Sequence, residues 1–313
     1  MGNRWMVAAV AAALAFLTAC DLEDLGDFGG SGRYTDEFHY AYPLKPGGRV
    51  SIENFNGSIE ISSWTENSVE INGTKYAPTP EQLSALKIEV SAQPDTIYIR
   101  TVRPSERRGN MGARYVIRVP RQTQLDRVSS TNGPIRVWGV EGPARLRTTN
   151  GSVRAENMRG TLDAQTSNGG IEVRNQEGNT ALRTTNGRIR AEAVKGPFEA
   201  FTTNGGVVAQ VAKAGAERPV RVESSNGGVE LTLDSADRGD VRVSTSNGGI
   251  TLHLPEKMNA RLIAATSNST IRSDFDVQTQ GPVSKHRLEG LLGTGGPVYD
   301  LSTTNGTIRI LKQ

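Results

Sequence analysis

The sequence is poor in the residues that usually carry cross-links or catalysis. Its 313 residues include one cysteine, three histidines and only 5% aromatic residues. A single cysteine excludes an internal disulfide, so an exported fold would depend on packing and hydrogen bonds alone. The histidines, His39, His253 and His286, are too scattered to indicate a metal site or a catalytic triad. No phosphate loop, zinc-ligand spacing or Gly-x-Ser-x-Gly motif is present, so we expect no cofactor and no catalytic residue.

Strong net charge and long apolar runs are also lacking. The 36 Lys and Arg residues nearly balance the 33 Asp and Glu residues, giving a net charge of +3. This balance argues against nucleic acid as a partner of the whole chain. The longest apolar run, Met6 to Leu17, is too short to span a membrane as a helix but suits the apolar part of a signal peptide.

The single cysteine ends a motif that predicts lipid attachment. Leu17-Thr18-Ala19-Cys20 resembles the bacterial lipobox, in which the cysteine is acylated, commonly with palmitate, and becomes the mature N-terminus. We predict a lipoprotein signal peptide over residues 1–19 and a lipid-anchored flexible linker over residues 20–32. Multiple acyl chains would hold the protein stably on a membrane of the bacterial cell envelope, on its extracytoplasmic side, either in the periplasm or at the cell surface. An ordinary signal peptide with a chance cysteine is the alternative.

A short phrase, exemplified by "TTNGSVRA" at residues 148–155, recurs along the chain. Asn-Gly marks its centre at Asn56, Asn132, Asn150, Asn168, Asn186, Asn204, Asn226, Asn247 and Asn305, with Asn-Ser at Asn268. From Asn132 to Asn204 the spacing is eighteen residues four times in succession, and Gly142, Gly160, Gly178 and Gly196 each lie eight residues before an asparagine. A fixed period of this kind indicates a repeat architecture.

Alignment of the repeats shows two short strands in each copy. Apolar residues alternate before the asparagine, as in Ala144 and Leu146, and again after the glycine, as in Val153 and Ala155. Asn-Gly between such strands could form a hairpin in an antiparallel meander. We prefer a parallel β-solenoid, because near-identical columns are what stacking of like on like requires.

The solenoid interpretation assigns a role to the asparagines. They share the parity of the inward residues, so we predict a buried ladder of amide hydrogen bonds through Asn132, Asn150, Asn168, Asn186, Asn204, Asn226 and Asn247. The following glycines are expected to adopt positive φ. Residues 126–313 would form the solenoid, and residues 33–125 an irregular N-terminal cap that includes a short helix capped by Thr79. Ser273 to Tyr299 is interpreted as a long loop before the last rung.

The "TTNGxIxx" phrases, together with the signal and the strand "RYVIRVP", resemble the bacterial DUF4097 family of β-strand-repeat proteins, which are often labelled adhesins. The resemblance spans about residues 36–313. It implies an all-β, right-handed β-solenoid-like fold in the envelope. It implies no catalytic motif and no established biochemical activity.

Charge is distributed unevenly along the chain. Between Arg100 and Arg159, thirteen arginines face four acidic residues, a local charge of +9 that leaves the remainder at −6. Such a window is more often a solvated basic face without a ligand, and the sharper hypothesis is an anion-binding surface with Arg103, Arg107, Arg108, Arg145, Arg147 and Arg154 as candidates.

These observations predict a non-enzymatic, lipid-anchored envelope protein that acts as an adhesin-like or scaffold binding module. Its partners would be the membrane, through the anchor, and an anionic glycan, a lipid headgroup or an envelope protein. Two alternatives stay open. One is a polysaccharide hydrolase with Asp163 and Glu199 two rungs apart. The other is an envelope-stress accessory that binds another protein.

Overall fold

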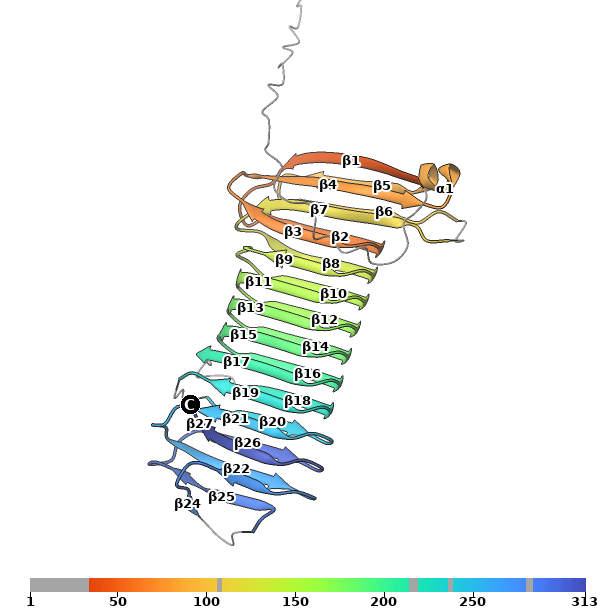
Figure 1. Ribbon diagram of the computed structural model, residues 1–313. Coiled ribbons are helices and arrows are strands. Elements are labelled where there is room, and N and C mark those ends of the chain that lie inside the picture. The colour runs from red at the N-terminus through yellow and green to blue at the C-terminus, as the bar shows by residue number, and fades with distance from the viewer. Residues whose placement is uncertain (1–33, 106–108, 214–218, 236–238, 280–283) are drawn as a thin grey trace, which may run out of the picture. The chain divides into compact units, whose positions relative to one another are not determined.

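A computed structural model describes residues 34–105, 109–213, 219–235, 239–279 and 284–313 (Figure 1). These residues belong to one compact unit, Gly32–Gln313. They form two long sheets, built mostly of parallel strands, and one short helix. The predicted all-β parallel solenoid is therefore confirmed. The predicted signal peptide, the linker and Cys20 lie outside the described residues.

The two sheets run side by side along the stack. Sheet A contains, in spatial order, β1 (Tyr34–Pro43), β4 (Ser68–Ala77), β7 (Gly112–Pro120), β3 (Ile59–Trp64), β9 (Ile135–Trp138), β11 (Val153–Arg159), β13 (Ile171–Glu177), β15 (Ile189–Lys195), β17 (Val207–Lys213), β19 (Val229–Leu233), β21 (Ile250–Leu254), β27 (Ile308–Lys312) and β23 (Ile271–Ser273). Sheet B contains, from the opposite end, β24 (Gln278–Thr279), β25 (Arg287–Leu292), β22 (Ala260–Thr266), β26 (Val298–Thr303), β20 (Val241–Thr245), β18 (Val220–Asn226), β16 (Phe198–Asn204), β14 (Thr180–Asn186), β12 (Leu162–Asn168), β10 (Ala144–Asn150), β8 (Gln124–Asn132), β2 (Arg49–Asn56), β6 (Thr96–Val102) and β5 (Lys87–Gln93).

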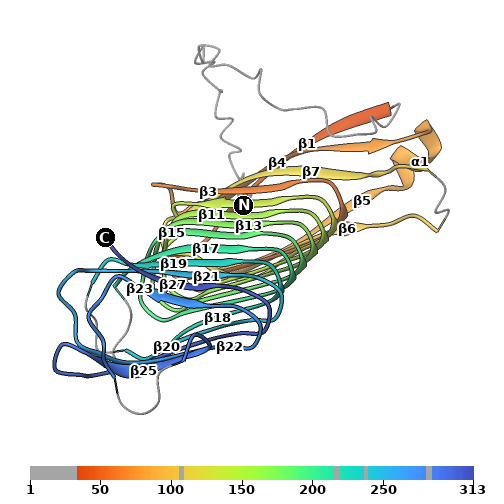
Figure 2. The ribbon, with the colours of Figure 1, turned by 60° about the horizontal axis from the view of Figure 1, so that its bottom comes forward.

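Each rung consists of one strand of sheet B, an Asn-Gly corner and one strand of sheet A. The strands on the two sides of a corner do not pair with each other, and each pairs in parallel with its equivalent in the next rung. Thus Leu146 lies opposite Ala164 and Val153 lies opposite Ile171, both at a register of eighteen residues. Figure 2 shows the rungs superimposed when the stack is tilted toward the viewer. The corner is a bend in a coil and not a hairpin.

The core lies between the two sheets and follows the predicted columns. Leu146, Ala164 and Leu182 of sheet B are fully buried, and Val153 and Ile171 of sheet A are buried opposite them. Because each column repeats similar residues, every rung meets a matching apolar surface above and below. Burial of these columns in register is what favours parallel stacking over a meander.

The asparagine ladder is confirmed in its bonding, but its predicted burial is wrong. Asn150 Nδ2 donates to Asn132 Oδ1 at 2.8 Å, and the pattern continues through all nine corners from Asn132 to Asn268 at 2.7–2.9 Å. These nine side chains are exposed. The inward alternation ends two residues earlier, at buried Thr148, whose Oγ1 donates to the Gly133 carbonyl at 2.9 Å. The chain then turns, so residue parity no longer predicts the face.

Two glycine columns make the corners possible for different reasons. Gly160, in the turn between rungs, has a φ of +117°, which favours glycine. Gly169, in an Asn-Gly corner, lacks a positive φ, but a Cβ there would collide with the Gly151 carbonyl of the neighbouring rung. The predicted positive φ holds at Gly57 and Gly133 and is wrong for Gly169. Close stacking, and not backbone handedness, excludes a side chain there.

The N-terminal end extends both sheets beyond the first rung, which is formed by β2 and β3 (Figure 1). Strands β7, β4 and β1 continue sheet A, while β6 and β5 continue sheet B. The predicted helix is α1 (Pro80–Ala85), and Thr79 Oγ1 accepts a hydrogen bond from the Gln82 N–H at 3.2 Å. Buried Tyr115 of β7 hydrogen-bonds Thr101 of β6 at 2.6 Å and so links the two sheets, and burial raises the pKa of Tyr115.

The C-terminal end has a different order from the sequence. The last rung of the chain, β26 and β27, lies between β20/β21 and β22/β23, so it is not the terminal rung in space. The segment predicted as a long loop, Ser273 to Tyr299, contains β24 and β25, and β25 pairs antiparallel with β22. The loop prediction is therefore wrong, because this segment closes the end of sheet B.

Candidate binding surfaces

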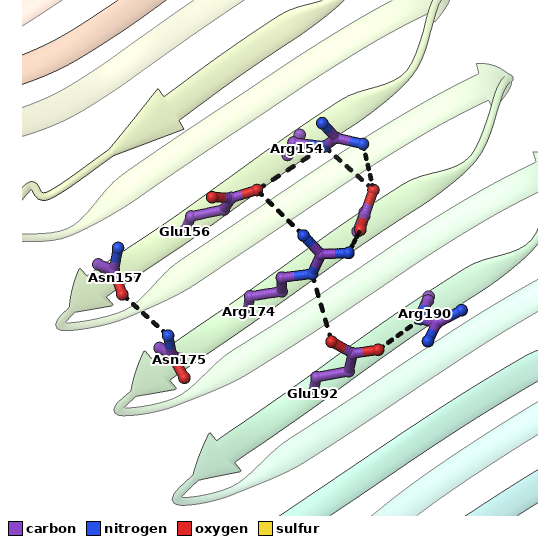
Figure 3. A network of polar contacts seen from close by, with 8 residues as sticks. Arg154, Glu156, Asn157, Arg174, Asn175, Arg190 and Glu192 are labelled. Atoms are coloured by element: carbon purple, nitrogen blue, oxygen red, sulfur yellow. Dashed lines mark hydrogen bonds and ion pairs between the residues drawn. The ribbon is translucent and has the colours of Figure 1, made fainter.

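The outer face of sheet A carries a lattice of arginine and glutamate side chains (Figure 3). Glu172 of β13 accepts hydrogen bonds from Arg154 of β11 at 2.6 and 3.0 Å, and it lies 2.6 Å from Arg174 Nη2. Arg174 Nε lies 3.2 Å from Glu192 of β15, which also accepts from Arg190 Nε at 2.5 Å. Each of these arginines is therefore held by at least one carboxylate.

The arginines of this lattice lower the pKa of Glu192. The hydrogen bond from Arg190, with the positive charges of Arg190 and Arg174, holds the pKa of Glu192 below its ordinary value. Beside the lattice, Asn175 Nδ2 donates to Asn157 Oδ1 at 2.9 Å and forms a second, short asparagine pair. Asn157 and Asn175 have positive φ, as does Ala193 at the equivalent position of the next rung. The surface of sheet A is thus internally paired.

The structure does not bring the six predicted anion-binding arginines together. Arg145 and Arg147 point outward from β10 on sheet B, whereas Arg154 belongs to sheet A. Arg103 lies beyond β6, with its guanidinium carbon 5.2 Å from the centre of the Phe55 ring. Arg107 and Arg108 lie outside the described residues. Of the four members that the structure describes, only Arg145 and Arg147 are neighbours on one strand.

The basic window of the sequence is largely neutralised in space by carboxylates from other rungs. Glu53, Glu60, Glu70, Asp163 and Glu172 lie outside the window. They pair respectively with Arg127, Arg136, Arg118, Arg147 and Arg154 inside it. Pairing between strands brings residues sixteen or more positions apart into contact, so charge along the sequence is a poor measure of local charge here. The pairs of Arg145 with Asp126, at 3.5 Å, and of Arg147 with Asp163, at 3.7 Å, are among the longer ones.

Sheet B carries an open groove next to the asparagine ladder. Its lining is mainly hydroxyl groups, with Arg183, Phe201 and Glu223 among them; the hydroxyl residues are Thr166, Thr184, Thr185, Thr202, Thr203, Ser224, Ser225, Ser244, Thr245, Ser246 and Ser302. Its volume is about 580 Å³. The groove runs across several rungs, so it presents the same group types at each step of the stack. Such a surface suits a long polar ligand that lies along the solenoid.

An aromatic side chain stands in this groove between two arginines. The Phe201 ring centre lies 5.3 Å from the guanidinium carbon of Arg183 on β14 and 5.4 Å from that of Arg221 on β18. These are cation–π contacts, which hold the two guanidinium groups beside the ring. Neither Phe201 nor its arginine partners were predicted as site residues from the sequence. The registers of eighteen residues between β14 and β16 and of twenty-two residues between β16 and β18 could have predicted the arginine contacts.

The carboxylates of the hydrolase alternative are separated by an arginine. Asp163 and Glu199 stand two rungs apart on sheet B, with Ala181 between them, as the sequence predicts. Arg183 reaches both: Nη1 lies 3.6 Å from Asp163 and Nη2 lies 3.4 Å from Glu199. A cation thus stands beside both carboxylates, whereas an inverting glycosidase needs space between its acid and its base for a water and a sugar.

Other common site types do not emerge from the part of the chain that the structure describes. No group of three or more His, Cys, Asp or Glu residues could hold a metal ion there. His39, His253 and His286 have separate neighbours, namely Asn72, Glu230 and the Ser269 carbonyl. Among the described helices, none has the length and apolar character needed to cross a membrane.

The fold and its surfaces define a two-sheet parallel β-solenoid with an exposed polar groove. Residues 181–311 match the family described as Toastrack DUF4097, so the predicted resemblance to DUF4097 is confirmed over this part of the chain. No curated protein matched the sequence.

Two similar solved structures complete the comparison. A "putative cell adhesion protein" from Clostridium sporogenes is 10% identical, with 89% of this chain and 100% of that chain covered and a TM-score of 0.24. A "putative adhesin" from Bacteroides fragilis is 13% identical, with 88% and 97% covered and a TM-score of 0.40.

Proposed function

We propose that this protein is a non-enzymatic, lipid-anchored binding module of the bacterial envelope, and that the outer face of sheet B binds an anionic glycan chain. The observation that carries the proposal is the groove lined by serine and threonine hydroxyls around Phe201. Five of the lining hydroxyls are buried and donate to glycine carbonyls of the neighbouring rung, namely those of Thr166, Thr184, Thr202, Ser224 and Thr245. The hydroxyls that remain accessible to a ligand belong to Thr185, Thr203, Ser225, Ser244, Ser246 and Ser302. Such hydroxyls can both donate and accept hydrogen bonds, as sugar hydroxyls do. The rungs repeat them along the axis, which suits a linear polymer.

Arg145 and Arg147 are the cations that would recognise the anionic groups of the glycan. Both side chains are more than half exposed, and their carboxylate partners lie 3.5 Å or more away. Such pairs contribute little in water, so a ligand carboxylate or phosphate can compete for the arginines at low cost. Arg147 belongs to the same outward column as Gln165, Arg183 and Phe201, which leads into the groove. Arg154, held at 2.6 Å by Glu172 on the other sheet, is not part of this surface.

A glycan-binding assay with matched arginine variants tests this proposal. We expect the purified protein to bind polysaccharides that carry carboxylate or phosphate groups, and to bind neutral polysaccharides of similar length more weakly. Arg145→Gln with Arg147→Gln should weaken binding of the acidic chains and reduce its salt dependence, whereas Arg154→Gln should leave both unchanged. Phe201→Ala should weaken the binding of both acidic and neutral polysaccharides. The proposal would be contradicted if Arg154→Gln lost as much binding as Arg145→Gln with Arg147→Gln. It would also be contradicted if the wild-type protein bound no polysaccharide of the panel.

The anchor is tested separately. Cys20 is the proposed attachment site, so metabolic labelling with a palmitate analogue should mark the wild-type protein and not Cys20→Ala. The variant should also leave the membrane fraction. Labelling that survives in Cys20→Ala would remove the lipid anchor from the proposal without affecting the glycan groove.

A further inference from the structure

The edge of sheet A at β1 is long and open. Strand β1 pairs with β4 over ten consecutive residues, Tyr34–Pro43, without a bulge, and its other edge has no partner strand among the described residues. An unpaired edge offers a row of free N–H and C=O groups to another strand. Proteins usually block such edges with short strands, lysines, prolines or bulges.

The other three sheet edges are better protected than β1. Strand β23 has three residues and β24 has two, so neither offers a useful template. Strand β5 has seven residues and begins with an exposed lysine, Lys87. Strand β1 has no lysine or arginine, and its only proline is the last residue. Of the four edges, β1 is the one suited to pairing.

The inner face of β1 also leaves apolar surface uncovered. Phe38, Tyr40 and Tyr42 are only partly buried, although they pack on the core, and the Phe38 ring lies 5.5 Å from that of Tyr115. Tyr34 is 42% exposed. At the other end of the strand, Tyr42 lines an apolar groove formed by residues 42–46, Asn67 and residues 92–94. An exposed tyrosine and an unfilled apolar groove thus lie at opposite ends of one strand.

From these observations we infer that β1 is a homodimer interface, in which two copies pair their β1 strands antiparallel about Phe38. In this register Tyr34 of each copy lies opposite Tyr42 of the other, against the apolar groove. Glu37 lies opposite His39, so a carboxylate faces an imidazole ring twice. Asp36 lies opposite Tyr40, and Thr35 opposite Ala41. The strand is therefore complementary to itself, as a two-fold interface requires.

The paired strands would join the two A sheets edge to edge and place the aromatic rows of the two copies side by side. Edge pairing supplies main-chain hydrogen bonds, and the tyrosine in the groove supplies apolar burial. The inference does not depend on the glycan proposal, because β1 and the sheet B groove lie on different elements. It also holds for a chain without a lipid, although confinement to a membrane would raise the effective concentration of the partner.

Disulfide cross-linking of the full-length protein in membranes tests the register. Thr35 and Ala41 are both exposed, and the proposed register places them opposite each other across the dimer. The double variant Thr35→Cys/Ala41→Cys should form a covalent dimer on mild oxidation. Each single variant should not form it, because the two cysteines of a dimer, one from each chain, would then lie six residues apart along the paired strands. That separation is about 20 Å. Cross-linking of the single variants as strong as that of the double variant, or none in the double variant, would overturn the register.

Measurement of the dimer affinity provides the second test and does not depend on new cysteines. We expect Glu37→Lys/His39→Lys to raise the dimer Kd by at least about tenfold, because like charges would face each other across the strands. Tyr34→Ala should also raise it. Trp138→Ala is the matched control, since Trp138 is also 42% exposed but lies on β9. A monomeric wild type that dimerises only after deletion of residues 21–32 would overturn the inference, since the edge would then be covered by its own chain.

Discussion

Asn150 donates a hydrogen bond to Asn132 at 2.8 Å, although both side chains lie on the exposed side of the corner. Water competes for both amides, so each bond in the ladder contributes less to stability than a buried one. The buried polar contact of the corner is the threonine beside it, exemplified by Thr166, whose Oγ1 donates to the Gly151 carbonyl at 2.8 Å. The most conspicuous residue of the repeat is therefore not its most protected one.

This difference predicts the order of two substitutions in the same corner. Asn168→Ala should lower the free energy of unfolding by about 0.5 to 1 kcal/mol, because its two ladder bonds are exposed to water. Thr166→Ala should lower it by about 1 to 3 kcal/mol, because the Gly151 carbonyl would lose a buried donor. Urea denaturation of both variants measures the two values. The reverse order would show that the ladder and not the threonine column holds the corner.

Adjacent glycines in one corner should differ sharply in their tolerance of alanine. A Cβ at Gly169 would collide with the Gly151 carbonyl, whereas a Cβ at Gly170 would lie 3.2 Å from the Arg188 carbonyl, its nearest neighbour. Gly169→Ala should destabilise the protein by about 1 to 3 kcal/mol through overpacking, and Gly170→Ala should cost clearly less. Thermal unfolding of the pair tests the difference, and similar losses would argue against close stacking as the cause.

Ala193 offers a stabilising substitution. It has a φ of +53°, as Asn157 and Asn175 have at the equivalent positions of the two preceding rungs. Asparagine tolerates this conformation better than alanine, and its amide would extend the Asn157–Asn175 pair by one rung. Ala193→Asn should therefore raise the free energy of unfolding by about 1 kcal/mol. Ala193→Val is the control and should lower it, because a β-branched residue opposes positive φ.

Glu289 predicts a pH dependence of stability at the C-terminal end. Its carboxylate accepts hydrogen bonds from Arg261 at 2.7 Å and Arg287 at 3.1 Å, and these bonds hold its pKa below the ordinary value of 4.5. A lowered pKa in the folded state means that this contribution is present above pH 4.5 and is lost as the pH falls through the folded-state value. Glu289→Gln should make stability less dependent on pH below 4.5 and leave the slope near neutral pH unchanged. An unchanged slope in acid would contradict the assignment.

The solenoid could be predicted because its strands repeat with a fixed period and each rung packs on a copy of itself. The inward columns, such as Leu146 and Ala164, follow directly from residue alternation. That alternation fails at the corner, where the chain bends between Thr148 and Asn150, so parity placed the asparagine on the wrong side. The position of β26 could not be predicted either, since its pairing with both β20 and β22 depends on a chain reversal that the period does not encode.

The candidate surface was harder to predict than the fold, because charge was counted along the sequence. Arg154 appears unpaired in its sequence window, yet Glu172 of the next rung holds it at 2.6 Å. The groove around Phe201 depends on arginines from β14 and β18, which are the strands on either side of β16 in the stack. A column-by-column count across rungs would have placed Glu172 directly opposite Arg154.

The position of β26 and β27 within the stack also constrains the order of assembly. Strands β22 and β23 precede them in the sequence but find their parallel neighbours only in β26 and β27. Neither strand therefore has its parallel neighbour in place until β26 and β27, which ends at Lys312, are available. Rungs can add one by one from the N-terminal side as far as β21, whereas the final two must form together. A protein truncated before β26 would therefore lose an interior rung and leave β22 and β23 without a parallel partner.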